Sequence, residues 1–387
     1  MEFKVLQSEF SRALLTSGKS ILSRANLPIL SNVLVKAGGT NIEVVSTNLE
    51  TATRVKMGAK VGSAGEITVN GKLIFEFVSQ LPGGELKFEK LGEEVVISTK
   101  GYSARFTTMP PEEFPAIPTI EKGVSIEVDS RQFVKKVSRT VFSAAQDEGR
   151  PILTGVLCEI NKNRIRMVAT DGYRLGYEEI EMDALKNLPS MKINVPARAL
   201  GEVAKIISEG ILQEEQEKNE KKKINILISD ALNQINFKID GVEFTSRLIE
   251  GEYPNWQKII PSVFNTKVKI NRVEFIKLVK ITSIFARESG NIIKLKFEPS
   301  TGTRSGKLSV LATSSQVGSS EVDCEVGIAG KGGEIAFNYR YLAEVLSAID
   351  DEEINFEMNE SLNPGKITGT NLKDPYFHII MPVRLQS

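Results

Sequence analysis

Most of the chain consists of short runs of alternating apolar and polar residues, a pattern typical of half-buried strands. Residues 354–357 follow it strictly, and residues 42–45 and 224–228 interrupt it at one position each. A few stretches instead place apolar residues three or four positions apart, as amphipathic helices do, and residues 73–81 and 199–207 are among them. The pattern therefore predicts many strands and a small number of short helices.

This pattern occurs three times along the chain. Each copy opens with a helical stretch marked by a phenylalanine, at Phe10, Phe133 and Phe275. Phe133 follows Phe10 by 123 residues, and the same step separates Thr47 from Thr170, near the end of a strand in each copy. Equal steps between unrelated markers indicate an internal repeat rather than chance similarity.

Each copy is doubled in turn, because a strand, a helix and several further strands occur twice within it. The predicted fold class is α+β with antiparallel sheets, built as three homologous domains. We expect the domains to span residues 1–121, 122–263 and 264–387. The step from the second copy to the third is longer because residues 213–223 form a charged insert, which is typical of a solvated loop.

Charge is distributed unevenly, although the chain as a whole is neutral with 49 basic and 49 acidic residues. The first helical stretches of the three copies together hold 11 basic and two acidic residues. A basic residue stands two positions after each phenylalanine, on the opposite side of the helix: Arg12, Lys135 and Lys277. By the same projection, further basic residues are expected on that side: Lys19, Arg139 and Lys280.

Basic helix faces that share one surface would bind the phosphates of any duplex without reading its sequence. Few aromatic residues accompany these basic positions, which disfavours single-strand binding by base stacking. The alternative is that exposed helix faces are charged for solubility alone.

Four segments carry a resemblance to a known family. They are Leu27-Pro28-Ile29-Leu30, residues 169–175, residues 252–261 and the tail Met381-Pro382-Val383-Arg384-Leu385. In order and spacing they resemble the beta subunit of bacterial DNA polymerase III, the sliding clamp, over essentially the whole chain. The resemblance implies three DNA-clamp domains per chain and a head-to-tail homodimeric ring around double-stranded DNA.

The resemblance also implies roles for individual residues. The positions that match DNA contacts are Arg24, Gln146, Arg150 and Arg198, beside the helix residues Arg12, Lys135 and Lys277. A cleft for short peptides of the replicative polymerase, the clamp loader and other partners is implied at Leu153, Thr170, Gly172, Tyr173, Arg174, Leu175, Pro254, Lys258, Ile259, Tyr341, Met381, Pro382, Val383, Arg384 and Leu385. Lys258 stands where the family pattern has arginine, and Gln386 and Ser387 extend past the usual end.

A seam between two subunits is implied at Ile284 and Phe285, facing Arg105 and Phe106 of the other subunit. The alternative for these apolar residues is ordinary core packing.

Residues that could carry catalysis are sparse. The lone histidine, His378, stands in an apolar strand pattern and is expected to be structural. Gly18-Lys19-Ser20 lacks the earlier glycine of a phosphate loop, because Ala13 occupies that position. No nucleophile–base pair and no metal-ligand spacing is visible, so we predict no catalytic residue, metal or cofactor.

Two other function classes stay open from the sequence. One is an enzyme that acts on nucleotides with a site drawn from separate loops, and the other is a scaffold that binds partners but not DNA. Mass in solution and nucleotide hydrolysis distinguish them from a dimeric ring.

The cellular location is expected to be the cytoplasm. Cys158 and Cys324 lie far apart and are expected to be buried, reduced thiols. No apolar run approaches the ~18 residues of a membrane span, and the first residues do not resemble a signal peptide.

Overall fold

The computed structural model describes residues 1–21, 27–117, 119–147, 149–186, 188–211, 221–301 and 305–384. The chain divides into two compact units. Unit 1 contains Met1–Val134 and Glu202–Leu248, and unit 2 contains Lys135–Gly201 and Ile249–Ser387. None of the described helices is long and apolar enough to cross a membrane.

The order of elements repeats with the predicted period. The first third of the chain forms β1 (Glu2–Leu6), α1 (Gln7–Ser17), β2 (Asn32–Gly38), β3 (Asn41–Thr47), β4 (Thr51–Gly58), β5 (Lys60–Ser63), β6 (Gly65–Asn70), α2 (Gly71–Gln80), β7 (Glu85–Leu91), β8 (Glu94–Thr99) and β9 (Tyr102–Thr107). The middle third forms β10 (Gly123–Asp129), α3 (Ser130–Ser138), β11 (Gly155–Asn161), β12 (Arg164–Thr170), β13 (Arg174–Glu181), β14 (Met191–Pro196), α4 (Ala197–Ile206), β15 (Lys223–Ser229), β16 (Gln234–Ile239) and β17 (Val242–Arg247).

The last third forms β18 (Thr266–Asn271), α6 (Arg272–Ala286), β19 (Ile292–Glu298), β20 (Lys307–Ser314), β21 (Gly318–Glu325), β22 (Gly327–Gly330), β23 (Gly333–Asn338), α7 (Tyr339–Ala348), β24 (Glu353–Met358), β25 (Gly365–Gly369) and β26 (Phe377–Ile380). Apart from the short β5 and β22, every third is a strand, a helix and three strands, used twice. The prediction of doubled α+β repeats is therefore confirmed.

Antiparallel pairing joins the repeats within each unit. Unit 1 holds a sheet of order β5-β1-β7-β8-β9 and a larger one of order β10-β15-β16-β17-β4-β3-β2-β6. Unit 2 holds β14-β11-β12-β13-β26-β25-β24-β18-β22 and β21-β20-β19-β23. Each large sheet is continuous because the last strand of one half-domain pairs with the last strand of another, β4 with β17 and β13 with β26.

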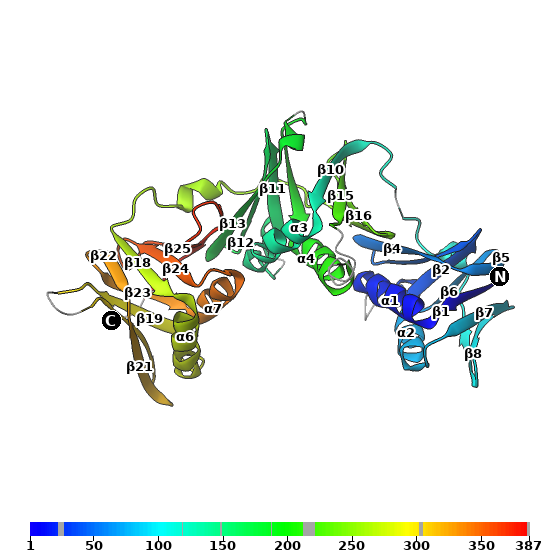
Figure 1. Cartoon of the computed structure of the whole chain (residues 1–387), viewed down its shortest axis with the longest axis horizontal. Coiled ribbons are helices and arrows are strands. Elements are labelled where there is room, and N and C mark those ends of the chain that lie inside the picture. The colour runs from blue at the N-terminus through cyan, green and yellow to red at the C-terminus, as the bar shows by residue number, and fades with distance from the viewer. Residues whose placement is uncertain are drawn as a thin grey trace. The chain divides into compact units, whose positions relative to one another are not determined.

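The helices lie against these sheets through the residues that the sequence pattern selected. Phe10 and Leu14 of α1 are buried in the core of unit 1. Phe275 and Val279 of α6 are buried in the core of unit 2. Figure 1 shows α1 beside α2 in unit 1, and α6 beside α7 in unit 2.

The first backbone N–H groups of a helix lack partners within the helix, and asparagine side chains accept hydrogen bonds from them in three of the described helices. The side chains of Asn70, Asn271 and Asn338 accept hydrogen bonds from backbone N–H groups in the first turns of α2, α6 and α7. Such caps contribute about 1 kcal/mol each, which matters for helices of 10 to 15 residues.

Both cysteines are buried and free, as expected. Burial raises the pKa of the Cys158 thiol to about 12, so it stays protonated and unreactive.

Candidate functional site

The basic residues two positions after each phenylalanine are exposed. Arg12, Lys135 and Lys277 all present their side chains on the helix surface away from the core. Lys135 forms an ion pair with Asp350 at 3.0 Å, and both side chains are largely solvated. Such exposed pairs contribute little free energy, so a phosphate could replace the carboxylate at small cost.

One basic residue does not lie where the helical projection placed it. Arg139 is buried, and its guanidinium contacts Asp374 and Asp350 and lies over the Tyr376 ring. The expectation was wrong because α3 ends at Ser138, so the angular step of a helix no longer applies at residue 139. Lys136 of α3 is also buried, so α3 exposes fewer basic side chains than the sequence count suggested.

The residues matched by family resemblance to DNA contacts lie on exposed positions. Gln146, Arg150 and Arg198 are exposed, and Arg24 lies outside the described residues. Arg150 donates a hydrogen bond to the backbone oxygen of Asp171 at 3.1 Å, so it also borders the turn before β13.

Two further basic residues occupy positions equivalent to that of Arg198. Arg198 is the second residue of α4, and the corresponding positions of α2 and α7 hold Lys72 and Arg340, which are also exposed. The sequence contains a signal for these positions, since each basic residue follows the end of a strand by two positions.

The turn from β12 to β13 has a well-defined geometry. The Thr170 hydroxyl donates to the backbone oxygen of Arg174 at 2.5 Å and accepts from the N–H of Gly172 at 3.0 Å. Asp171 Oδ1 accepts from the N–H groups of Tyr173 and Arg174. Gly172 has φ +90°, a conformation that favours glycine, and the turn leaves Tyr173 60% exposed.

Arg174 is the buried centre of this region. Its guanidinium pairs with Asp171 at 3.1 Å and with Glu344 of α7, and it donates to the backbone oxygen of Phe142 at 2.5 Å. It also lies over the ring of Tyr341, 4.5 Å from the centroid. Arg174 therefore connects the turn to α7, and Tyr341 is held half-buried beside it.

The C-terminal tail follows β26 and forms backbone hydrogen bonds beyond the last residue of that strand. The N–H of Met381 donates to the backbone oxygen of Tyr173 at 2.8 Å, and the N–H of Val383 donates to that of Ala336 at 2.8 Å. Met381, Pro382 and Val383 are half-buried and Arg384 is exposed. Leu385, Gln386 and Ser387 lie outside the described residues.

The remaining matched positions surround a small apolar cluster. Leu175 packs with Trp256 and Ile379, while Pro254, Lys258 and Ile259 of the same segment as Trp256 are exposed. Leu153 is buried just before β11. Unit 2 thus presents apolar and polar groups together on the β12–β13 turn, the tail, α7 and the 253–259 segment. We call the surface formed by Tyr173, Pro254, Lys258, Ile259, Tyr341 and residues 381–384 the partner surface, after the role that the family resemblance implies.

His378 lies beneath this surface and is fully buried. Its ring stacks on Phe142, with 5.4 Å between centroids, and neither ring nitrogen has a hydrogen-bond partner. Burial, assisted by the charge of Arg174, lowers the pKa of His378 to about 3. A neutral imidazole enclosed in this way has no access to a substrate. No group of three or more metal-binding side chains occurs in the described parts of the chain.

The residues matched to a subunit seam lie on an edge strand in unit 1 and on a helix that packs against an edge strand in unit 2. Phe106 and Arg105 lie on β9, an edge strand of unit 1. The ring of Phe106 packs against that of Phe77 of α2, with 5.5 Å between the ring centroids. Ile284 is 61% exposed on α6, which packs against the edge strand β21 of unit 2. Phe285 is half-buried against the core of unit 2, so core packing accounts for part of its environment.

Comparison with known proteins agrees with these features. Family models of the DNA polymerase III beta subunit match residues 1–118 (N-terminal domain), 127–255 (central domain) and 257–384 (C-terminal domain). The chain is 28% identical to a beta sliding clamp of Staphylococcus aureus over 396 aligned positions, which cover 99% of each chain.

Solved structures show the same fold over the full length. A DNA polymerase III beta subunit from Thermotoga maritima matches with a TM-score of 0.89 at 27% identity, and 100% of each chain is covered. A DNA polymerase sliding clamp from Bacillus subtilis matches with a TM-score of 0.90 at 22% identity and the same coverage.

Proposed function

Because the chain belongs to the DNA polymerase III beta subunit family, we propose that two copies join head to tail into a ring that encircles duplex DNA and tethers the replicative polymerase. Members of the family are sliding clamps and not enzymes, so the prediction of a DNA sliding clamp without catalytic activity is confirmed. The ring, its joints and the roles of single residues are proposals.

The observation that carries the ring is the repeated strand pairing. β4 ends a first half-domain and pairs with β17, which ends a second half-domain; β13 pairs with β26 in the same way. By the same rule β21 should pair with β9, yet both are edge strands in the described chain. An edge strand has backbone N–H and C=O groups that can pair with a strand of another chain. In a head-to-tail dimer, β9 of each copy would pair with β21 of the other.

The repeats also fix the register of the proposed joint. Phe244 faces Thr53 in the β17–β4 pair. The strand ladders place Ala104 at the position of Phe244 and Ser320 at that of Thr53. We therefore place Ala104 of one subunit opposite Ser320 of the other.

Charge at the two edges is complementary. β9 exposes Arg105, whereas β21 exposes Glu321, Asp323 and Glu325. On the helix side, Ile284 and Phe285 of α6 would approach Phe106 and α2 of the other subunit, which would cover the exposed Ile284 side chain.

A neutral chain can remain on DNA if the ring holds it by topology. Phosphate contacts from Arg12, Lys135, Lys277, Arg24, Gln146, Arg150 and Arg198 can then be weak, which allows sliding. Lys72 and Arg340 are proposed to join this set.

The partner surface is proposed to bind short segments of the replicative polymerase, the clamp loader and other clamp-binding proteins. Exposed Tyr173 and Ile259 and half-buried Met381 offer apolar contacts, and Arg384 and Lys258 offer polar ones at its border.

The three domains are proposed to meet at residues 121/122 and 263/264. The proposed cellular location is the bacterial cytoplasm.

A pair of cysteines tests the joint directly. In the β17–β4 ladder, the N–H of Arg247 donates to Glu50, so the pair Phe244–Thr53 lies between hydrogen-bonded pairs, where side chains are closest. The double variant Ala104→Cys and Ser320→Cys should form an intersubunit disulfide and run as a dimer without reductant. The matched control, Arg105→Cys with Ser320→Cys, puts the thiols on opposite faces and should stay monomeric in the same gel. Failure of the first pair to cross-link, or equal cross-linking by the control, would contradict the proposed register.

A further inference from the structure

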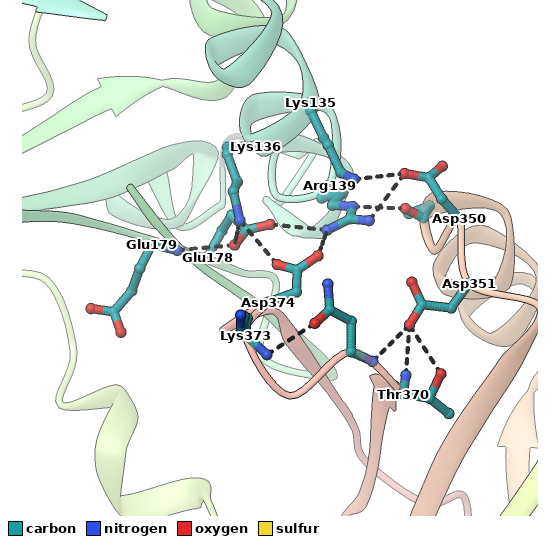
Figure 2. Close-up of polar contacts among 12 residues, drawn as sticks. Lys135, Lys136, Arg139, Glu178, Glu179, Asp350, Asp351, Thr370, Lys373 and Asp374 are labelled. Carbon is teal, nitrogen blue, oxygen red and sulfur yellow. Dashed lines mark hydrogen bonds and ion pairs between the residues drawn. The ribbon is translucent and has the colours of Figure 1, made fainter. Parts of the chain in front are cut away.

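A cluster of buried charges in unit 2 is not used by the proposed DNA contacts or partner contacts (Figure 2). Lys136 pairs with Glu178 at 2.7 Å and with Asp374 at 3.0 Å. Arg139 pairs with Asp374 at 2.5 Å, with Glu178 at 3.5 Å and with exposed Asp350 at 3.1 Å. We call Lys136, Arg139, Glu178 and Asp374 the charge cluster.

The fold does not require these charges. Lys136 and Arg139 follow Phe133 by three and six positions, where the first repeat has Ala13 and Thr16. The third repeat has Leu278 and Ile281 at these positions. Glu178 of β13 corresponds by strand register to Val55 of β4 and Val322 of β21.

Small or apolar residues thus serve at two of the three equivalent places. A buried ion cluster is generally no more stabilising than apolar packing, because desolvation offsets the attraction. We therefore expect the charge cluster to have a role specific to the pairing of β13 with β26.

A difference in loop length suggests that role. In unit 1, β16 and β17 are joined by the two residues Asp240 and Gly241. The corresponding connection between β25 and β26 runs from Thr370 to Tyr376. A tight turn sets the register of the following strand, whereas a seven-residue loop does not. Asp374 anchors this loop to α3 only three residues before β26 begins.

The charge cluster is connected to the partner surface through β13, through the segment from Asp374 to Val383, and through Asp350, the exposed partner of Arg139. β13 carries Arg174 at one end and Glu178 further along. α7 carries Tyr341 and Glu344, and Asp350 follows its end. The segment from Asp374 leads through β26 to Met381 and Val383.

We propose that Lys136, Arg139, Glu178 and Asp374 are positioning residues for partner binding. They fix the register of β26 against β13 and thereby hold Met381 beside Tyr173 and Val383 beside Ala336. This role deepens the proposed function and rests on it for the identity of the bound partner.

The test exchanges Lys136, Arg139 and Glu178 for their counterparts in the first repeat and removes the charge of Asp374. The quadruple variant Lys136→Ala, Arg139→Thr, Glu178→Val and Asp374→Asn leaves no unpaired buried charge, and Asp374→Asn alone is the milder variant. The matched control, Lys267→Ala, removes one partner of a 3.0 Å ion pair with Glu357 on the same sheet. Purified replicative polymerase from the same organism is the probe, with each variant as the full-length dimer.

We expect the quadruple variant to remain dimeric and to bind polymerase at least tenfold more weakly, with a smaller loss for Asp374→Asn and none for the control. Amide hydrogen exchange should accelerate at Met381 and Val383 but not along the β11–β12 ladder. Polymerase affinity within twofold of the parent, or unchanged exchange at both amides, overturns the proposal. If the quadruple variant does not fold, Asp374→Asn decides by the same criteria. If the parent itself fails to bind polymerase, the proposed function fails, and the exchange measurement still decides whether the cluster fixes the tail.

Discussion

The buried histidine gives a prediction whose size can be worked out. His378 is the only histidine in the chain, it is fully buried, and its pKa is lowered from 6.5 to about 3. In the unfolded chain the imidazole titrates near pH 6.5. Between pH 6.5 and about 3 the imidazole therefore binds a proton in the unfolded state but not in the folded state. The free energy of unfolding is thus unaffected by this group above pH 6.5 and decreases as the pH falls below it.

The expected loss follows from 1.36 kcal/mol per pKa unit. Lowering the pH from 7.5 to 5.0 crosses roughly 1.5 units below the unfolded pKa, which gives a loss of about 2 kcal/mol. Glu178, whose pKa is raised mainly by burial, changes stability in the opposite direction as the pH falls. The variant His378→Leu removes the imidazole and leaves Glu178 in place, so the difference between the two proteins isolates the histidine.

Urea unfolding at pH 7.5 and 5.0 and at one protein concentration measures this difference. The single tryptophan, Trp256, packs with Ile379 next to His378, so its fluorescence reports the relevant domain. The parent should lose about 2 kcal/mol more than His378→Leu between the two pH values. At pH 7.5 the variant should be at least as stable, because two unpartnered buried nitrogens are removed. An equal loss in both proteins would show that the imidazole is not buried and neutral.

Three further predictions concern the proposed ring and the partner surface. Replacing Ile284 and Phe285 together by aspartate should give monomers in analytical ultracentrifugation, because burying unpaired charge costs several kcal/mol; a dimer of unchanged strength would place the joint elsewhere. Deleting Leu385 onward should abolish polymerase binding while the dimer persists, and unchanged affinity in a pull-down would refute the assigned surface. Replacing Arg12, Lys135 and Lys277 by glutamine should weaken binding to any duplex and flatten its salt dependence, with the log–log slope falling by about 0.9 for each phosphate that is no longer neutralised. The same slope in the parent and the triple variant would remove these residues from the DNA surface, with Lys267→Gln on a sheet strand as the control.

Local periodicity carried the prediction of the repeats. The burial of Phe10 with Leu14, and of Phe275 with Val279, follows from residues within one helix, so the sequence contains all the information required. Arg139 was misplaced because α3 ends at Ser138, and the spacing of apolar residues did not indicate that end.

Long-range partners could not be predicted in the same way. The environment of Arg174 depends on Glu344 and Tyr341, which lie far along the chain, and nothing local indicates that this arginine is buried. The pairing of β13 with β26 has the same character. Family resemblance implied that Arg174, Tyr341 and Met381 belong to one site, whereas the charge cluster joins residues from distant segments that no local pattern relates.

The central claim is that topology, rather than affinity, holds this neutral chain on DNA. The most direct test loads the protein onto nicked circular DNA with its clamp loader and follows the bound fraction before and after the circle is cut once. We expect retention on the intact circle at high salt and rapid loss from the linear product through its free ends. Equal retention on circular and linear DNA would contradict an encircling ring.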